Sequence, residues 1–471
     1  MDKRLERILP RVQKPARYVG GEFNAIMKDK SKVDTRVAFC FPDTYEIGMS
    51  NLGMRILYGV MNNIEGVWCE RCFAPWGDME QEMRRANIPL YALESFDPIR
   101  DFDIIAFSVG YEMAFPAMVD MLDLAGVPLH ASERTALTPL VVAGGTAMYN
   151  CEPIADFIDL AFIGEGEEMD VELIELHRQA RREGWSKHDF LVRAAQIRGV
   201  YVPSLYDVDY NDDGTVKSIT AKDGAPKTVL KRIVQDMDKA YYPTKTIVPS
   251  TEIVQDRVSL ELFRGCIRGC RFCQAGYVYR PVRNRSEELL RGYAIEAVED
   301  SGYQDMTLSS LSTSDYPQLV ELCDDLEDFC AQRHLTLALP SLRADNFSMA
   351  LIGADGAAAK GQKNGPYVCA RGGHAETARR HQQKSHGGRP ARLLPPRVRG
   401  RIQRGQTLLY AGSSDGNGRG RARHCRHCGA CDARLARERR EQEPRRSHHG
   451  VDLVVRAQAP HGLPVGAADP H

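Results

Sequence analysis

Short apolar runs alternate with amphipathic segments through residues 35–200 of the chain. The first run, Val37-Ala38-Phe39-Cys40-Phe41, predicts a buried strand. Ser50 or Asn51 then offers an N-cap for a helix with apolar residues on one face, namely Met54, Leu57, Tyr58 and Met61. Further strands are expected at Tyr91–Leu93, Ile104–Val109, Leu140–Ala143 and Leu160–Ile163. This alternation predicts an α/β domain with a doubly wound parallel sheet, whose ligands bind outside the carboxyl ends of the strands.

The same alternation returns after residue 258. Strands are predicted at Val258–Phe263, Met306–Ser310 and Leu335–Pro340, with one helix between Ser286 and Gly302 and another from about Asp315. Such repeats predict a partial (β/α) barrel, whose chemistry lies at the carboxyl ends of its strands. The predicted organisation is an arm (1–34), an α/β domain (35–200), a connector with a hairpin at Asn211–Gly214 (201–257), a partial barrel (258–352) and a tail (353–471).

Glycine-rich loops follow three of the predicted strands. The first contains Asp43, Tyr45 and Gly48, and the other two contain Gly144-Gly145 and Gly164-Glu165-Gly166. Glycine lets the backbone approach a ligand closely, so these loops are candidate binding elements. The structural alternative is that each glycine only serves a tight strand-to-helix turn.

The composition narrows the setting of the protein. No apolar stretch reaches 18 residues, and no apolar run follows Met1-Asp2-Lys3-Arg4, so we expect a cytoplasmic protein with no membrane span and no signal peptide. Thirteen cysteines in such a chain favour metal binding over disulfides. The net charge of −1 hides a basic tail, since residues 353–471 carry 20 Arg, 3 Lys and 9 acidic residues.

Three cysteines provide the strongest chemical signal in the chain. Cys266, Cys270 and Cys273 form a Cys-x3-Cys-x2-Cys run, with Phe272 before the last cysteine. Iron–sulfur clusters normally take four cysteines, so three leave one iron open to a substrate or cofactor. Structural zinc needs four ligands, and the next cysteines, Cys323 and Cys330, fall on an apolar helical stripe.

This run resembles the cluster loop of the radical S-adenosylmethionine (SAM) superfamily. The resemblance is most specific at Cys270–Gly276 and Tyr279–Arg283. It implies a [4Fe-4S] cluster whose open iron binds SAM, a reductant such as flavodoxin or ferredoxin, and cleavage of SAM to a 5′-deoxyadenosyl radical. The residues that it implies around SAM are Phe272 beside the adenine, Ser309, Ser310 and Ser312 near the amino group, and Arg343 near a carboxylate.

The three glycine loops together resemble the cobalamin-binding domain that often precedes a radical SAM barrel. The family motif Asp-x-His-x-x-Gly reads here as Asp43-x-Tyr45-x-x-Gly48, and a phenol is a poor cobalt ligand. Two interpretations stay open: cobalamin binds without a lower histidine, or the domain keeps the fold and has lost the cofactor. The cofactor-binding candidates of this domain are Asp43, Tyr45, Gly48, Gly144, Gly145, Gly164 and Gly166.

We therefore predict a radical SAM enzyme, with methyl transfer or modification of RNA or protein as candidate outcomes and RNA, protein or a small molecule as substrate. One alternative is a methylthiotransferase, which needs a second cluster. The cysteines available for it, Cys40, Cys69, Cys72 and Cys151, do not match that family's spacing. The other alternative is a non-catalytic iron–sulfur or corrinoid-binding protein.

The tail has a different character from the rest of the chain. Residues 353–471 contain no Phe, Trp or Met, and they hold 9 of the 13 histidines, so they cannot build a core. Segments 366–377, 405–418 and 448–465 can be encoded by DNA whose +1 frame reads sequences that resemble the later half of radical SAM proteins. We predict a frameshift near Ile352 that leaves a disordered tail and an impaired chain. The metal-knuckle-like His424–Cys431 segment and the arginine runs are then accidents of frame, not a nucleic-acid arm.

Overall fold

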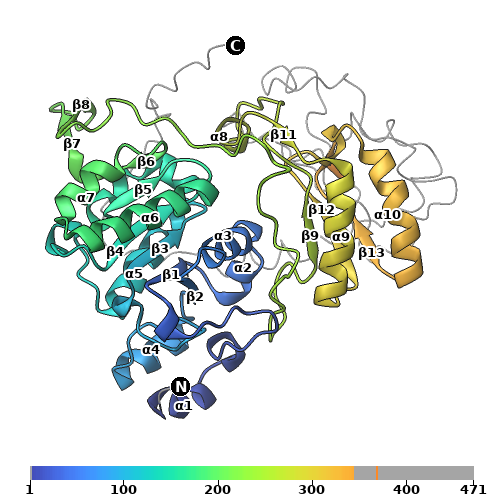
Figure 1. Cartoon of the computed structure of the whole chain (residues 1–471), viewed down its shortest axis with the longest axis horizontal. Helices are drawn as coiled ribbons and strands as arrows, with labels where there is room; N and C mark the ends of the chain where they lie inside the picture. The colour runs from blue at the N-terminus through green and yellow to red at the C-terminus, as the bar shows by residue number, and fades with distance from the viewer. Residues whose placement is uncertain (1–2, 344–367, 370–471) are drawn as a thin grey trace, which may run out of the picture. The chain divides into compact units, whose positions relative to one another are not determined.

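The computed structural model describes residues 3–343 and 368–369 (Figure 1). These residues belong to one compact unit of the chain. Nearly all of the predicted disordered tail, 353–471, lies outside the described residues, including the His424–Cys431 segment. Among the described helices, none is long and apolar enough to cross a membrane.

A six-stranded sheet forms the centre of the first domain, as the alternating pattern predicts. Its strand order is β2-β1-β3-β4-β5-β6, with β2 through β5 parallel and β6 antiparallel to β5. The order doubles back at β1, which places a topological switch point between β1 and β3, where ligands of such sheets bind. The strands are β1 Thr35–Phe41, β2 Val67–Phe73, β3 Ile104–Ser108, β4 Leu140–Gly144, β5 Leu160–Phe162 and β6 Val200–Tyr201.

Helices connect these strands and enclose a large apolar core. In the best-defined start of a helix, the Asn51 side chain caps α3 by accepting a hydrogen bond from the Met54 amide at 2.9 Å. Helices α3 and α6 pack against each other. The helices of this part of the chain are α1 Lys3–Ile8, α2 Tyr45–Met49, α3 Leu52–Asn62, α4 Gly77–Ala86, α5 Phe115–Ala125, α6 Gly166–Glu183 and α7 Lys187–Ala194.

One strand of the sheet differs from the prediction. The structure has no sheet strand at Tyr91–Leu93, where only an isolated bridge joins Tyr91 to Pro98. The neighbour of β1 is instead β2, whose sequence contains Glu70 and Arg71 and therefore does not read as an apolar run. Both charged side chains are buried and ion-paired, Glu70 with Arg36 at the sheet and Arg71 with Glu22 and Glu94. Paired burial of charge thus hides this strand from hydrophobic periodicity.

A second region, residues 258–343, contains a smaller parallel sheet with its own core. Strands β9 (Val258–Glu261), β12 (Asp305–Ser309) and β13 (Thr336–Ala338) lie in the order β13-β12-β9. Helices α9 (Glu287–Ser301) and α10 (Leu319–Arg333) connect them. Ser286 occupies the N-cap of α9, but its side chain makes no capping hydrogen bond, and α10 begins at Leu319 rather than near Asp315. Among the described residues these three strands form an open sheet and not a closed barrel.

The remaining elements are short. The predicted hairpin of the connector is formed by β7 (Tyr206–Tyr210) and β8 (Val216–Ala221). An antiparallel pair, β10 (Phe263–Arg264) and β11 (Arg283–Asn284), brackets the cysteine loop and helix α8 (Ala275–Val278). Strand β14 (Leu342–Arg343) pairs in parallel with β15 (Val368–Cys369).

Candidate functional site

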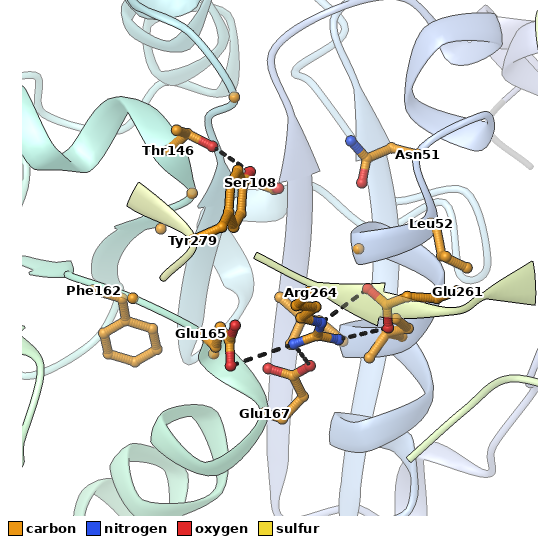
Figure 2. A pocket seen from close by; sticks show the side chains of 18 of the residues that line it. Asn51, Leu52, Ser108, Thr146, Phe162, Glu165, Glu167, Glu261, Arg264 and Tyr279 are labelled. Atoms are coloured by element: carbon orange, nitrogen blue, oxygen red, sulfur yellow. Dashed lines mark hydrogen bonds and ion pairs between the residues drawn. The ribbon is translucent and has the colours of Figure 1, made fainter. Parts of the chain in front are cut away.

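A cavity of about 450 Å³ lies at the carboxyl ends of the first domain's strands. Its apolar wall is one face of the sheet, formed by Phe39, Ala106, Val142 and Phe162 from four neighbouring strands. The beginnings of α3 and α6 line it as well, and so do residues of the second region, including Glu261, Arg264 and Tyr279. Figure 2 shows the side chains from these segments directed toward one another around the cavity.

Two of the three glycine loops reach this cavity. Gly144, Gly145, Gly164 and Gly166 are all part of its lining, as their position after β4 and β5 predicts. Gly145 and Gly164 have left-handed backbone angles, with φ of +102° and +123°. A Cβ atom would lie 2.4 Å from the Val109 carbonyl oxygen at Gly145 and 2.1 Å from the Arg232 carbonyl oxygen at Gly164. The protein's own backbone therefore requires glycine at these two positions, and the turns deliver main chain to the cavity edge.

The first glycine loop is directed elsewhere. Asp43, Tyr45 and Gly48 do not line the cavity. Tyr45 is 1% exposed and its hydroxyl donates a hydrogen bond to Glu22 at 2.9 Å. Burial, together with the nearby Glu22 carboxylate, raises the pKa of Tyr45. Its ring packs edge-on against Phe73 at 5.3 Å between centroids, and a Cβ atom at Gly48 would lie 2.3 Å from Phe73.

These contacts make the loop after β1 a packing element. The phenol is committed to Glu22, which also pairs with the buried Arg71 at 2.8 Å. Asp43 is engaged as well, because it accepts a hydrogen bond from Tyr111 at 2.7 Å. Asn51, Leu52 and Gly53, a few residues further on, are the part of this segment that does reach the cavity.

A buried arginine joins the cavity wall to the cysteine loop. Arg264, which immediately precedes the loop, pairs with Glu261 at 2.9 Å and with Glu167 at 2.6 Å, and Figure 2 shows the guanidinium between these carboxylates. Burial by itself would raise the pKa of Glu261, but the guanidinium groups of Arg264 and Arg285 hold it below its ordinary value. Glu165 pairs with Arg283 at 2.7 Å, at the other end of the loop. Both ends of the cysteine loop are therefore fixed by carboxylates that follow β5.

The loop itself presents three thiols that form no disulfide among the described residues. Cys270 is buried, and Cys266 and Cys273 are half-buried. Gly265, with φ of +97°, starts the loop where a Cβ atom would lie 2.5 Å from the Pro281 carbonyl oxygen. The amide of Cys273 donates to the carbonyl of Cys270 at 3.0 Å, which turns the chain between the second and third thiols.

The donor set suits a multi-iron cluster. Among the described residues, no three His, Cys, Asp or Glu side chains converge around a point that would suit one metal ion. A [4Fe-4S] cluster binds each thiolate through a separate iron, so it does not require that convergence. Phe272, which the resemblance places beside the adenine of SAM, is 50% exposed.

The predicted serines follow β12. Ser309 and Ser310 line the cavity, and Ser310 shares a hydrogen bond of 3.0 Å with Thr313. Ser312 is 3% exposed and its hydroxyl has no hydrogen-bond partner among the described residues. An ion pair between Arg268 and Asp315 ties the cysteine loop to this segment. Arg343 lies in β14, and its side chain is outside what the structure describes.

The other cysteines of the first domain are placed differently. Cys40, Cys69, Cys72 and Cys151 are all buried, and Cys40 and Cys72 are register partners inside the sheet. Burial raises the pKa of Cys151 to about 12 and raises the pKa values of Cys40 and Cys69 as well. Thiols held protonated inside a core are poor metal ligands, because the thiolate is the ligand.

Asp170 is among the polar residues of the cavity that sequence patterns missed. It lies in α6, is 9% exposed, and one of its carboxyl oxygens, Oδ2, has no hydrogen-bond partner among the described residues. The signal was present in the sequence: Met169, Asp170, Leu173, Ile174 and His177 form the buried stripe of α6. An acidic residue on an apolar stripe is a departure from amphipathic patterning and so indicates a candidate site residue.

Comparison with known proteins relates the first domain to radical SAM proteins. Residues 53–203 match the family model described as "Radical SAM proteins, N-terminal". This match covers most of the first domain and confirms the predicted relationship to radical SAM proteins. An uncharacterized protein of Methanocaldococcus jannaschii, MJ0966, is 28% identical over 320 residues, which are 67% of this chain. The chain spans 57% of the length of that relative.

Two solved structures of the radical S-adenosylmethionine methyltransferase TsrM from Kitasatospora setae are also similar. One, with tryptophan substrate and the SAM analog aza-SAM bound, has a TM-score of 0.49 and 14% identity, covering 76% of this chain and 63% of TsrM. The other, with cobalamin and a [4Fe-4S] cluster bound, has a TM-score of 0.46 and 14% identity, covering 75% and 62%.

Proposed function

Starting from a chain whose N-terminal domain matches that of radical SAM proteins, we propose that the protein holds a [4Fe-4S] cluster and SAM, as a radical SAM enzyme does. One observation carries this proposal: three thiols lie on a single loop, bracketed by β10 and β11, beside the cavity. When bound, the cluster supplies the electron that cleaves SAM. Cys266, Cys270 and Cys273 are the residues that would hold three of its irons.

The residues around this loop have defined tasks in the proposal. Arg264 and Arg283 fix the two ends of the loop through buried ion pairs, so the thiols keep one spacing. Ser309 and Ser310 supply hydroxyls at the carboxyl end of β12, where barrel chemistry is located. The unpartnered hydroxyl of Ser312 is available to a polar group of SAM.

A corrinoid is the second group that we propose, in the cavity of the first domain. The apolar sheet face, the glycine turns after β4 and β5, and Asp170, whose Oδ2 atom has no hydrogen-bond partner among the described residues, fit a large ligand with apolar and polar parts. Tyr45 faces Glu22, so the corrinoid would bind without a cobalt ligand from this loop. Methyl transfer to an unactivated carbon is the reaction class that this pair of cofactors supports, on RNA, protein or a small molecule.

The alternative of a methylthiotransferase is disfavoured by the buried cysteines. A second cluster would have to draw its ligands from Cys40, Cys69, Cys72 and Cys151, and all four are enclosed in the core of the first domain. A non-catalytic iron–sulfur or corrinoid-binding protein stays as the competing proposal for this chain, because the described part of the second region contains three parallel strands and no closed barrel. We expect the product of the +1 frame after residue 352 to cleave SAM.

Anaerobic reconstitution with iron and sulfide tests the proposal. The full chain should bind roughly four irons per molecule and turn brown. Its absorption spectrum should resemble that of other [4Fe-4S] proteins. Cys266→Ala, Cys270→Ala and Cys273→Ala should each abolish stable cluster binding, because the loop has no spare thiol. Cys323→Ala is the matched control and should bind iron normally, since burial raises the pKa of that thiol in α10 to about 12.

Product analysis separates the enzyme from the binding protein. After reduction, the frame-corrected protein should form 5′-deoxyadenosine from SAM, and the chain as printed should form much less. A colourless, zinc-loaded protein would contradict the cluster. Cluster binding without 5′-deoxyadenosine from either protein would favour the non-catalytic alternative.

A further inference from the structure

A groove of about 750 Å³ runs along helix α6 of the first domain. One side of it is formed by the later turns of α6, and the other by the end of α7 with the residues that follow. Leu176 and Ile197 form an apolar floor, because both line the groove and pack against the core of the domain. Arg182, Arg193 and Arg198 line it with exposed side chains and form a basic rim. We call this surface the arginine groove.

The acidic residues of the arginine groove do not offset its basic rim. Glu172 pairs with Arg232 at 2.7 Å, and Glu175 pairs with Arg178 at 2.7 Å. Each of these carboxylates is therefore already neutralised by an arginine outside the rim. The positive charge of the rim is left without a counter-charge from the groove itself.

The rim arginines carry the charge that a ligand would meet. Among the described residues, Arg182, Arg193 and Arg198 form no ion pair with a carboxylate. The guanidinium of Arg193 lies 4.0 Å from the centre of the Trp185 ring and donates a hydrogen bond to the Asp189 carbonyl at 3.0 Å, which orients its plane. A guanidinium presents a planar fork of donors that matches phosphate oxygens, and three of them along one groove attract an anion.

The arginine groove adjoins the cavity of the candidate site through one segment of the connector. Arg232 lines the groove, and Gly164 lines the cavity. These two residues form a parallel bridge, and the Glu165 amide donates a hydrogen bond to the Arg232 carbonyl at 3.0 Å. A ligand that lies along the groove therefore has one end close to the wall of the cavity.

The shape and charge of the arginine groove favour a linear polymer that is anionic along one edge. Its lining on α6 extends from Glu172 to Arg182, which spans about 15 Å at the rise of an α-helix. A basic rim beside an apolar floor suits single-stranded nucleic acid, whose phosphates meet cations while its bases cover apolar side chains. An acidic peptide carries its charges at side-chain ends with a polar backbone between them, so it leaves the floor of Leu176 and Ile197 without a partner.

We propose that the arginine groove binds single-stranded RNA, and that RNA is the substrate class of this protein. Arg182, Arg193 and Arg198 contact phosphates, and the apolar floor accepts bases. The groove then holds a long substrate while one of its nucleotides reaches the cavity. The assignment of a substrate rests on the proposed function, whereas the binding of RNA does not.

Binding of a fluorescein-labelled oligouridylate tests the arginine groove. Its affinity for the full chain, without reconstitution of a cluster, is measured by fluorescence anisotropy at several salt concentrations. Arg182→Ala/Arg198→Ala should weaken binding roughly ten-fold at low salt. The slope of log affinity against log salt should decrease in magnitude by about 1.4, which is about 0.7 for each lost phosphate contact. The melting temperature should not change, because neither side chain has an ion pair among the described residues.

A charge-matched variant controls for general electrostatics and for the basic tail. Arg291→Ala/Arg333→Ala removes the same two charges from α9 and α10, where the two side chains are 58% and 53% exposed. It should leave the affinity and the salt slope nearly unchanged. The tail is the same in every variant, so a difference between the two double variants reports the arginine groove.

The outcomes separate this inference from the proposed function. If the two double variants bind the oligouridylate equally, the RNA assignment is overturned, and the iron and 5′-deoxyadenosine measurements still decide the proposed function. If oligoglutamate of equal charge displaces the groove-dependent RNA as well as unlabelled RNA does, the groove is a docking site for an acidic protein and the RNA assignment is again overturned. If RNA binds through the groove but neither the chain nor its frame-corrected form makes 5′-deoxyadenosine, the proposed function fails together with the substrate assignment, and the RNA-binding site stands.

Discussion

The loop after β1 and the loop after β10 each carry a motif that resembles a cofactor-binding motif, but they are built in opposite ways. In the first, Tyr45 is buried against Phe73 and hydrogen-bonded to Glu22, so its polar atom is already used. In the second, Cys266, Cys270 and Cys273 form no disulfide among the described residues, and two of these thiols are half-buried. The first loop is part of the core, whereas the second carries the three cysteines that we propose as cluster ligands, between two anchored ends.

The two loops also differ in where their charged residues lie. The charges near Tyr45 lie beneath the loop, in the buried pair of Arg71 with Glu22, and they fix the loop to the sheet. Near the cysteines, Arg264 and Arg283 at the two ends of the loop pair with carboxylates of the first domain, and Arg268 inside the loop pairs with Asp315. A motif such as Asp-x-Tyr-x-x-Gly therefore cannot be assigned a ligand role without knowing what lies beneath it.

The contrast between the two loops is tested most strongly by removing the ion pairs that anchor the cysteine loop. Arg264→Met leaves Glu167 without its 2.6 Å partner and leaves Glu261 with Arg285 alone, at 3.3 Å. Because an unpaired buried charge is costly, we expect a loss of about 3–5 kcal/mol in the free energy of unfolding, measured with urea. After reconstitution with iron and sulfide, the Arg264→Met variant should also release iron faster than the parent chain.

An exposed pair gives the matched control for this substitution. Arg333 pairs with Glu299 at 2.8 Å, and both side chains are about half exposed, at 53% and 52%. Arg333→Met should therefore change the free energy of unfolding by less than about 1 kcal/mol. Equal effects of the two substitutions would show that Arg264 is not an anchor.

The first domain should be sensitive to mild acid through His177. This side chain is fully buried, neither ring nitrogen has a hydrogen-bond partner among the described residues, and burial lowers its pKa from 6.5 to about 4. The unfolded chain therefore binds a proton below about pH 6.5 that the folded chain does not bind until about pH 4. Stability is lost as the pH falls through this window, by about 3 kcal/mol at its lower end.

Substitution isolates this effect. His177→Leu should flatten the stability profile between pH 6.5 and pH 4.5, measured by urea unfolding of the full chain at several pH values. His188→Leu, at a side chain that is 62% exposed, should leave the profile as it is. A parent chain whose stability does not change in this window would contradict the assignment.

How far the sequence predicts the molecule can be judged from particular elements. Apolar runs predicted β1, β3, β4 and β5 because each of these strands is buried on both faces. They missed β2, because Glu70 and Arg71 interrupt it and their pairing partners come from distant segments. The cysteine loop was predicted from the spacing of its cysteines, because this signal lies within a short segment of the sequence. Asp170 and Arg264 were missed as site residues, because their roles arise from segments that meet only in the folded protein.

The smallest expected effect concerns Tyr45 and decides whether its loop can serve as a ligand. Tyr45→Phe removes the hydrogen bond to Glu22 and should cost about 1–2 kcal/mol of unfolding free energy. Tyr45→His restores the Asp-x-His-x-x-Gly pattern, but its imidazole would occupy the buried site that faces Glu22 and Phe73. We therefore expect no nitrogen splitting in the electron paramagnetic resonance spectrum of bound cob(II)inamide, which has no base nitrogen of its own to ligate cobalt. Such a splitting would show that the loop can turn toward the cavity, and the contrast between the two loops would then be one of sequence rather than of architecture.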